Sequence, residues 1–370
     1  MQPYTPETLP LEDLSFSNDI IKHLGPANRA IAEFNGILQG VINPSILLSP
    51  LYNTEAVLSS KIEGTQATVD EVLRFDAGIQ STDEIKNHDI QEIVNYRKTL
   101  LCASEELAHR PITLGFIKQM HKMLMDSVRG SNKTPGEFRK EQNWIGFYGS
   151  TIESATFVPP SPFHLMEHLE NWEKYLAYDD IDVLVQTAIV HAQFEMAHPF
   201  KDGNGRIGRL LIPLFLYQKK VLTFPAFYLS EYLESHRDIY YEKLGNISSK
   251  KQWKEWIVFF LQAVIEQAKQ NTLRVKRTLQ LYDEMKSTIT SCTRSQHSIQ
   301  VLDAMFKKPI FGSADFSALA GLEPAYARQC IQKLLKEKVI YQIREKQGRK
   351  PAIYAFGRLL EVTGMMQSLT

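Results

Sequence analysis

Apolar residues recur at spacings of three and four along most of this chain of 370 residues, a period typical of amphipathic helices. The pattern predicts helices over residues 17–24, 27–38, 52–62, 69–75, 87–102, 113–125 and 164–175. Gly25 and Pro26 are expected to separate the first two. Two regions, 143–158 and 339–356, are instead rich in β-prone residues, and each predicts a short strand pair. We therefore expect a mainly α protein.

The last third of the chain has a different organisation. Residues 252–289 hold no Gly or Pro, and they predict one long helix that leaves the main body and links to another part. Three short helices follow, over 299–306, 313–320 and 324–337, and then the β-rich tail. This order is typical of a winged helix-turn-helix domain.

Composition excludes several classes of protein. Lys plus Arg and Asp plus Glu both total 42, which argues against a uniformly polycationic nucleic-acid binder or an acidic tail protein. Cys102, Cys292 and Cys330 lie far apart, so neither a disulfide framework nor a zinc cluster is expected. The first residues lack the basic and apolar regions of a signal peptide, and the most apolar stretch, 256–265, is about half the ~20 residues of a membrane span. We expect a cytoplasmic protein without a membrane partner.

The densest run of polar, basic and glycine residues is HPFKDGNGRIGR, residues 198–209, between two apolar-periodic helices. A glycine-rich loop that opens a helix favours phosphate, because its backbone N–H groups and the helix dipole attract anions. Gly203 and Gly205 leave room for a phosphate, and Asn204 between them tolerates a tight turn. Arg206 and Arg209 are three residues apart, so both guanidinium groups can address phosphates from one face.

Two further residues of this segment have side chains suited to catalysis. Asp202 offers the hard oxygen that Mg²⁺ prefers, and His198 can accept a proton near neutral pH. Phe200, apolar in a polar loop, is expected to point inward as an anchor. A polar surface loop is the alternative for any single residue, but so many suitable residues in twelve positions favour a functional site. His191, seven residues before His198 in a periodic helix, is interpreted as structural.

At every fixed position the segment resembles the signature of the Fic domain family, HPFx[D/E]GNGRxxR. The matching residues are His198, Pro199, Phe200, Asp202, Gly203, Asn204, Gly205, Arg206 and Arg209. The resemblance covers about residues 9–268. It implies a helical core with a small β-hairpin flap that transfers AMP from ATP to a Ser, Thr or Tyr hydroxyl of a target protein or of itself. A sister branch of kinases has a lysine where this chain has Gly205, so adenylylation is favoured over phosphorylation.

The resemblance also implies a role for each part of the site. His198 corresponds to the general base, Asp202 to the Mg²⁺ ligand, the glycine loop to the phosphate cradle, and the two arginines to contacts with the phosphate tail. By position, the flap residues 154–157 would lie against the nucleotide. The residues expected to contact ATP are Glu63, Ser154, Ala155, Thr156, Phe157, His198, Asp202, Gly203, Asn204, Gly205, Arg206, Ile207, Gly208, Arg209, Tyr240 and Tyr241.

Tyr240 and Tyr241 resemble the paired tyrosines that wall the family's adenosine pocket. Packing within a helix is an equally good interpretation of this pair. The family's later Asn in this region has no clear counterpart, although Asn246 and Ser248 are near.

Residues 59–64, SSKIEG, fit the family's inhibitory motif [S/T]xxxE[G/N]. Ser59 and Glu63 are four apart and share one face of a helix, and Gly64 is a suitable helix stop. A carboxylate there could pair with Arg209 and hold ATP in an unproductive orientation. An ordinary exposed Glu is the alternative interpretation. The resemblance favours an autoinhibited enzyme.

The C-terminal part is basic, since residues 295–358 hold 11 Lys or Arg and 5 Asp or Glu, a net charge of +6. The expected recognition helix starts with Ala325, Tyr326, Arg328 and Gln329, and the expected wing carries Lys346, Arg349 and Lys350. DNA binding is the first interpretation, and protein contact or dimerisation is the second. A nucleotide-sensing transcriptional regulator is therefore the alternative function.

These observations predict four segments: an N-terminal helical region with the inhibitory motif (1–105), a Fic catalytic core (106–270), a linker helix (271–294) and a winged helix-turn-helix domain (295–370). The expected partners are a hydroxyl-bearing target protein, a second copy of the chain in a homodimer, and DNA.

Overall fold

The computed structural model describes residues 2–12, 14–41, 43–126, 133–147, 149–348 and 350–365. The protein is mainly α, as the sequence periodicity predicts, with one small sheet. The chain forms two compact units built from discontinuous segments. The first unit comprises Met1–Gly36, Leu58–Thr65 and Gln91–Lys269, and the second comprises Ile37–Val57, Gln66–Ile90 and Gln270–Thr370.

These units differ from the predicted division at residue 105. Residues 37–57 and 66–90, predicted as part of the N-terminal region, belong with the C-terminal residues. The boundary near residue 270 coincides with the predicted end of the catalytic core. The four predicted segments stay a prediction.

Helices make up the first unit, with some of them extending into the second. They are α1 (Asn18–Gln39), α2 (Ser45–Ile62), α4 (Glu84–Glu106), α5 (Leu114–Leu124), α6 (Pro162–Ala177), α7 (Val183–Ala197), α8 (Asn204–Gln218), α9 (Ser230–Ser235), α10 (Arg237–Lys250) and α11 (Trp253–Thr293). α7 packs between α6 and α8 and also contacts α10. It is buried on nearly every side, as expected for a helix that is apolar all round.

The expected break at Gly25 and Pro26 is wrong, because α1 runs through both residues. A proline inside a helix loses one backbone hydrogen bond. Ile20, Ala27 and Ile31 are nevertheless all buried, on one continuous stripe of the helix. The burial of this stripe outweighs the local preference for a break.

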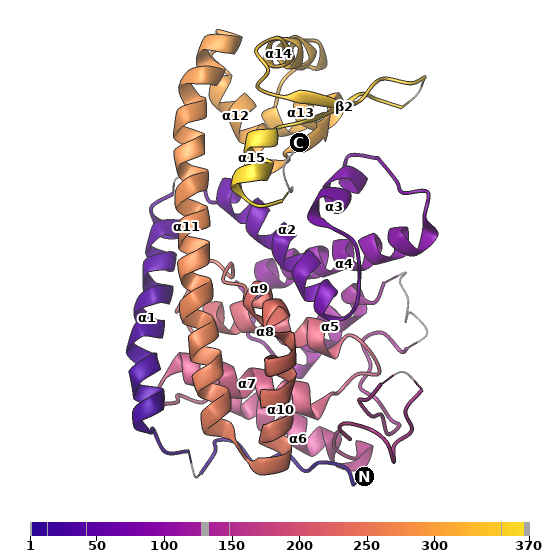
Figure 1. Ribbon diagram of the computed structural model, residues 1–370, viewed down its shortest axis with the longest axis vertical. Helices are drawn as coiled ribbons and strands as arrows, with labels where there is room; N and C mark the ends of the chain where they lie inside the picture. The colour runs from indigo at the N-terminus through magenta and orange to yellow at the C-terminus, as the bar shows by residue number, and fades with distance from the viewer. Residues whose placement is uncertain are drawn as a thin grey trace. The chain divides into compact units, whose positions relative to one another are not determined.

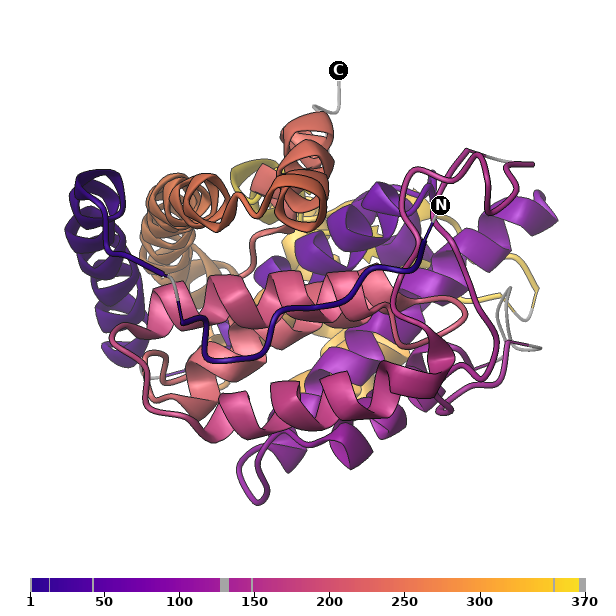
Figure 2. The same cartoon turned by 90° about the horizontal axis from the view of Figure 1, so that it is seen from below.

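The residues before α1 cross the first unit in extended form (Figure 2). Leu9 exchanges backbone-to-side-chain hydrogen bonds of 2.8 and 2.9 Å with Asn171 of α6. Gln193 of α7 donates to the carbonyl of Glu7 at 2.7 Å. These contacts hold the N-terminal segment along α6 and α7.

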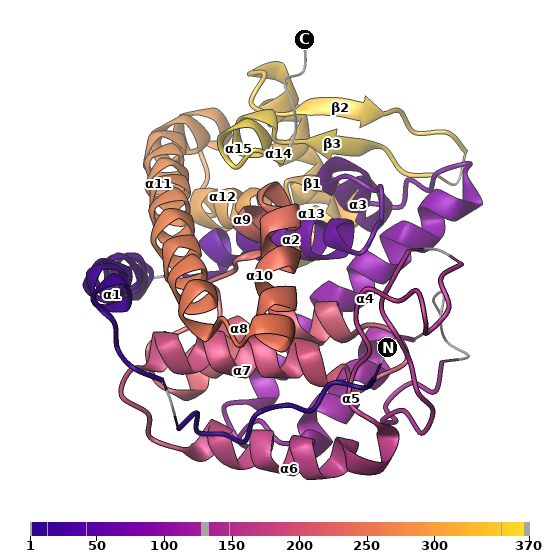
Figure 3. The ribbon, with the colours of Figure 1, turned by 60° about the horizontal axis from the view of Figure 1, so that its bottom comes forward.

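The second unit contains the remaining elements. They are α3 (Val69–Asp76), α12 (Ser298–Lys307), β1 (Ile310–Gly312), α13 (Ser313–Ala320), α14 (Pro324–Lys336), β2 (Tyr341–Arg344), β3 (Ile353–Ala355) and α15 (Gly357–Val362). The strands form one antiparallel sheet in the order β1-β3-β2, and β2 and β3 are the predicted pair (Figure 3). β1 was not predicted, because three residues are too few to show alternation. Apart from β1 and α15, the elements follow the predicted order, and the assignment as a winged helix stays a prediction.

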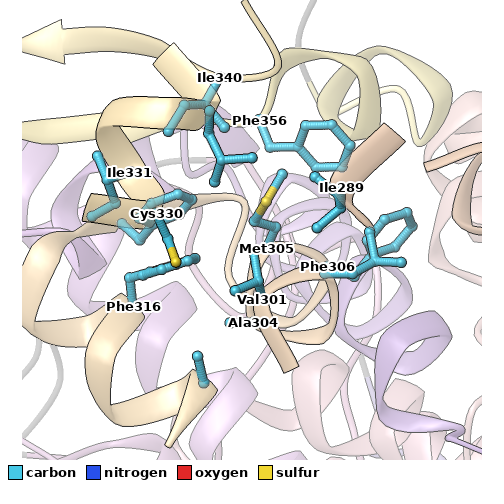
Figure 4. Packing of buried hydrophobic residues seen from close by; sticks show 14 of the residues in the cluster. Ile289, Val301, Ala304, Met305, Phe306, Phe316, Cys330, Ile331, Ile340 and Phe356 are labelled. Atoms are coloured by element: carbon cyan, nitrogen blue, oxygen red, sulfur yellow. The ribbon is translucent and has the colours of Figure 1, made fainter. Parts of the chain in front are cut away.

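The predicted long helix is α11, which continues from the first unit into the second. The last part of α11 buries Leu281, Met285 and Ile289, which are four residues apart, in the core of the second unit. This core also includes Val301, Met305, Phe306, Phe316, Cys330, Ile331 and Phe356 (Figure 4). The apolar stripe therefore makes residues 281–289 a structural part of this unit. Within the described residues, none of the helices combines the length and apolarity that crossing a bilayer requires.

Candidate active site

The segment 198–209 connects α7 to α8 through a tight loop. α7 ends at His198, whose backbone is left-handed (φ 44°, ψ 59°), and α8 is preceded by Gly203 (φ 78°). The amide of Asn204 folds back on the loop, accepting from the backbone N–H of Phe200 and donating to its carbonyl, both at 2.8 Å. Asn204 is 2% exposed. Its side chain therefore holds the loop in shape and leaves the backbone to face an anion.

Phe200 is fully buried, which confirms it as an anchor. Its ring stacks on His121 of α5 at 3.8 Å between centroids. The Nδ1 of His121 accepts from the backbone N–H of Gly136 at 2.8 Å, so Nε2–H donates to the carbonyl of Asp202 at 3.0 Å. Burial lowers the pKa of His121 to about 4, and a neutral ring suits this pair of bonds.

Arg139 is a second support of the loop that the sequence did not indicate. Its side chain is 3% exposed and donates to the carbonyls of His198 (2.9 Å), Pro160 (2.5 Å) and Ala197 (3.4 Å). Its backbone N–H donates to the carbonyl of Pro199 at 2.9 Å. A single arginine thus satisfies the carbonyls at the end of α7. An isolated Arg in a loop gives no sequence signal for this role.

Asp202 lies at the mouth of the loop with its side chain 43% exposed. Its Oδ1 accepts from the backbone N–H of Gly203 at 2.6 Å and lies 3.4 Å from Arg206. The described residues include no cluster of three or more His, Cys, Asp or Glu suited to a metal. One accessible carboxylate fits Mg²⁺, which is usually held by one or two carboxylates, substrate phosphate and water.

Arg206 is buried and pairs with Glu92 of α4 at 3.1 Å as well as with Asp202. The guanidinium that the sequence assigned to a phosphate is therefore engaged within the protein. Glu92 gave no sequence signal, because it lies over a hundred residues from the motif. Ile207 is fully buried in the apolar core, and its prediction as an ATP contact rested only on its position in the segment.

Arg209 is joined to the end of α2. Its Nε donates to Ser59 Oγ at 2.8 Å, and one terminal nitrogen donates to the Ser59 carbonyl at 2.8 Å and to Glu63 Oε1 at 2.6 Å. The same carboxylate oxygen lies against Gly205, where a Cβ would collide with it. Gly64 follows with φ 104°, a conformation that favours glycine. The predicted pair of Glu63 and Arg209 is therefore in contact.

Three ionisable side chains of the site have shifted pKa values. Desolvation opposes ionisation of Glu63, but Arg209 outweighs it, so the pKa of Glu63 lies below its ordinary value. Desolvation lowers the pKa of the half-buried His198 to about 4. Burial raises the pKa of Glu195, a carboxyl on α7, to about 7. At neutral pH the site therefore pairs an ionised Glu63 with a neutral His198.

The two tyrosines differ. Tyr240 is fully buried, and its hydroxyl lies 3.0 Å from Nε2 of His191, whose Nδ1 lies 3.0 Å from the carbonyl of Gly208. His191 is thus the structural residue that the sequence indicated, linking α10 to α8. Tyr241 is 44% exposed, with its ring 5.1 Å from that of Tyr240. Helix packing accounts for Tyr240, and Tyr241 is accessible to a ligand.

The expected flap hairpin is present in reduced form, as one antiparallel bridge between its two arms. Among the residues described around it, only Ile145 and Phe157 form a β-bridge. Ser154 instead closes a local turn with Thr151, and Ser154 and Thr156 are exposed, whereas Ala155 is buried. Ile145 is 40% exposed, so no continuous buried face fixes a longer register.

His121 and His191 predict a pH dependence of stability. Both are 1% exposed or less, and burial lowers their pKa values to about 4 and about 3, from 6.5. Below pH 6.5 the unfolded chain binds protons that the folded chain does not, so the free energy of unfolding decreases as the pH is lowered. Each residue should remove about 2 kcal/mol by pH 5. We expect the thermal midpoint to drop between pH 6.5 and 5, and His191→Gln to flatten the drop.

The control for this prediction is His109→Gln, which changes an exposed histidine. It should leave the pH dependence as in the unmodified protein. A His191→Gln variant with the full pH dependence would contradict the prediction.

Comparison with known proteins gives two adjacent family matches. The model described as Fic/DOC family N-terminal matches residues 21–105, and the Fic/DOC family model matches residues 111–216. Together they span just over half of the chain.

Curated relatives are similar over shorter stretches. The chain is 27% identical over 200 residues to the probable protein adenylyltransferase aq_aa38 of Aquifex aeolicus, covering 52% of this chain and 56% of that protein. It is 31% identical over 120 residues to protein adenylyltransferase fic-1 of Caenorhabditis elegans, covering 32% and 22%. The match thus spans about half of the first relative's length and less of the second's.

Solved structures share the fold. A Fic family protein from Desulfovibrio desulfuricans has a TM-score of 0.60 at 18% identity, with 96% of this chain and 98% of that chain covered. Fic-1 from C. elegans has a TM-score of 0.54 at 20% identity, with 70% and 71% covered.

Proposed function

From the premise that this chain belongs to the Fic/DOC family, we propose that it is a protein adenylyltransferase. It transfers AMP from ATP to a Ser, Thr or Tyr hydroxyl of a target protein or of the chain itself. One observation carries the proposal: a neutral His198 ends α7 in the loop before α8, whose N-terminus has no side-chain cap, and the same loop holds an accessible Asp202. The similarity to proteins named adenylyltransferases supports the same class of reaction.

The base is set up by the backbone of α7. Nδ1 of His198 lies 3.3 Å from the carbonyl of Glu195, which can only accept, so Nδ1 carries the proton and Nε2 keeps its lone pair. Nε2 takes the proton of the target hydroxyl as the hydroxyl oxygen forms a bond to the α-phosphorus of ATP. The bond from the α-phosphorus to the bridging oxygen breaks, and pyrophosphate leaves.

The N-terminus of α8 supplies the phosphate site. Its first backbone N–H groups have no partners within the helix, and the helix dipole adds positive potential. Asp202 would hold Mg²⁺, which neutralises phosphate charge when it is bound. Gly205 lets phosphate approach the backbone, and Arg209 is available to the γ-phosphate only when another anion does not occupy it.

That other anion is Glu63, which supports an autoinhibited resting state. Its carboxylate accepts a hydrogen bond from a terminal nitrogen of Arg209 and also occupies the space over Gly205. Phosphate and Glu63 therefore compete for the same positive groups. The side chain of Glu63 is 33% exposed, so it can turn outward without unfolding α2.

The direct test is mass spectrometry of the full chain incubated with ATP and a lysate. We expect proteins that carry an added AMP on a hydroxyl side chain when Mg²⁺ is present, and none after EDTA. Addition of a phosphoryl group in place of AMP would contradict the assignment to adenylylation.

A nucleotide-sensing DNA-binding regulator is the second candidate function. The observation that favours it is the exposed face of α14, which carries Arg328, Gln329, Lys333 and Lys336. The buried face of the same helix is apolar. Arg349 of the predicted wing lies outside the described residues. A gel shift with random DNA should show binding that weakens steeply with salt; protein contact alone predicts no shift.

A further inference from the structure

Glu195 is a half-buried acid in the site to which the proposed reaction gives no side-chain role. It lies on α7, one turn before His198. Its Oε1 is buried and has no hydrogen-bond partner among the described residues. A buried polar atom without a partner costs about 1–3 kcal/mol, so such an atom calls for a physical reason.

The side chain faces the same surface of α8 as Glu63. Gly205 and Gly208 are three residues apart and share one face of that helix. A Cβ on Gly205 would collide with Glu63 Oε1, and a Cβ on Gly208 would collide with Glu195 Oε1. Two carboxyl groups thus occupy neighbouring positions on this face, and only one of them is paired with Arg209.

The surroundings of Glu195 belong to the proposed nucleotide site. Arg209 lowers the pKa of Glu195 and Glu63 raises it. Glu195 in turn raises the pKa values of Tyr240 and Tyr241. Burial raises the pKa of Glu195 itself to about 7. A pKa near neutrality lets this carboxyl take up a proton beside a triphosphate, which reduces repulsion, and the carboxyl accepts a hydrogen bond in either protonation state.

The chemistry of ATP limits what can bond to this acceptor. Its phosphates offer acceptors and negative charge, so they do not suit Oε1. The target hydroxyl has its proton directed to His198. The remaining donors are the ribose hydroxyls and the adenine amino group. Resting on the proposed function, we infer that Glu195 reads the nucleoside of ATP by accepting a hydrogen bond from one of these groups.

Calorimetric titration of the full chain tests this inference without relying on catalysis. The parent is Glu63→Gly, which frees Gly205 and Arg209, and the ligands are ATP, 2′-deoxy-ATP, 3′-deoxy-ATP and inosine triphosphate with Mg²⁺. Glu195→Met removes the acceptor at similar side-chain length, and Glu195→Gln keeps it. Thermal unfolding of each variant checks that the fold is retained.

We expect Glu195→Met to weaken ATP binding by about 3- to 10-fold, the value of one hydrogen bond. One of the three analogues lacks the group that donates to Glu195, and Glu195→Met should not weaken the binding of that analogue any further. The analogue with unchanged affinity therefore identifies the donor group. Glu195→Gln should bind ATP within about 2-fold of the parent.

Two results would overturn the inference alone. One is unchanged binding of all four nucleotides by Glu195→Met. The other is an equal loss for all four, or an equal loss in the Gln variant, because that pattern belongs to a structural role or to a role through Arg209. A parent that binds no ATP would overturn the proposed function as well.

Discussion

Replacing Glu63 with glycine is expected to raise AMP transfer by at least about 10-fold, because a charge-assisted hydrogen bond contributes about 1.5–3 kcal/mol. The substitution removes the carboxylate that pairs with Arg209 at 2.6 Å and covers Gly205. Both positions then become available to phosphate. The measurement is the initial rate of labelling with ATP radioactive in the α-phosphate, with variant and unmodified protein compared at equal concentration.

Two matched variants show whether the effect belongs to Glu63. Ser59→Ala removes one of the three hydrogen bonds to Arg209 and leaves the Ser59 carbonyl in place. Its labelling rate should therefore lie between those of the unmodified protein and Glu63→Gly. Lys61→Ala breaks an exposed ion pair with Glu234 at the same end of α2 and should change nothing. Equal labelling by Glu63→Gly and the unmodified chain would show that Glu63 does not inhibit the enzyme, and would contradict the autoinhibited resting state.

Replacing His198 with alanine is expected to lower AMP transfer by about 10²–10⁴-fold, the usual contribution of a general base. The loss should appear in kcat, because the phosphate site consists of backbone groups and of other side chains. The rate is best measured in the Glu63→Gly background, where transfer is fastest. ATP binding by the double variant should match that of Glu63→Gly.

The control is His164→Ala, which changes an exposed histidine at the start of α6 and should keep full activity. If the double variant labels its targets as fast as Glu63→Gly, His198 is not the base. If it instead loses ATP binding, His198 shapes the loop through its left-handed backbone, and the kinetic role must be reassigned.

The sequence predicted best where one local signal suffices. The helices at 313–320 and 324–337 end within one residue of α13 and α14, because Gly321 and Pro324 mark their limits. Phe200 was identified as an anchor, since a large apolar side chain in a polar loop gains most by turning into the core. The pairing of Glu63 with Arg209 followed from the family resemblance, and no local pattern joins two residues 146 positions apart.

Predictions failed where packing decided between local options. The break at Pro26 was wrong because a buried stripe continues through it. The hairpin predicted at 143–158 is limited to one bridge, because its exposed arms provide no continuous buried face. The sequence predicted a linker helix after residue 270, and only the structure shows that this helix contributes Leu281, Met285 and Ile289 to a core. Each outcome depends on distant residues that a local pattern does not contain.

The sequence by itself determined the mainly helical class, the position of the loop and the residue types that handle phosphate and protons. Those features are set by side-chain chemistry and short-range spacing. Only the tertiary structure decided which polar groups bond to other parts of the protein and which remain available to a ligand. Arg206 is buried against Glu92, the Asn204 amide is used by the loop, and Glu195 Oε1 is left without a partner among the described residues. Burial and pairing arise between segments far apart in the chain, so they follow from the packed fold alone.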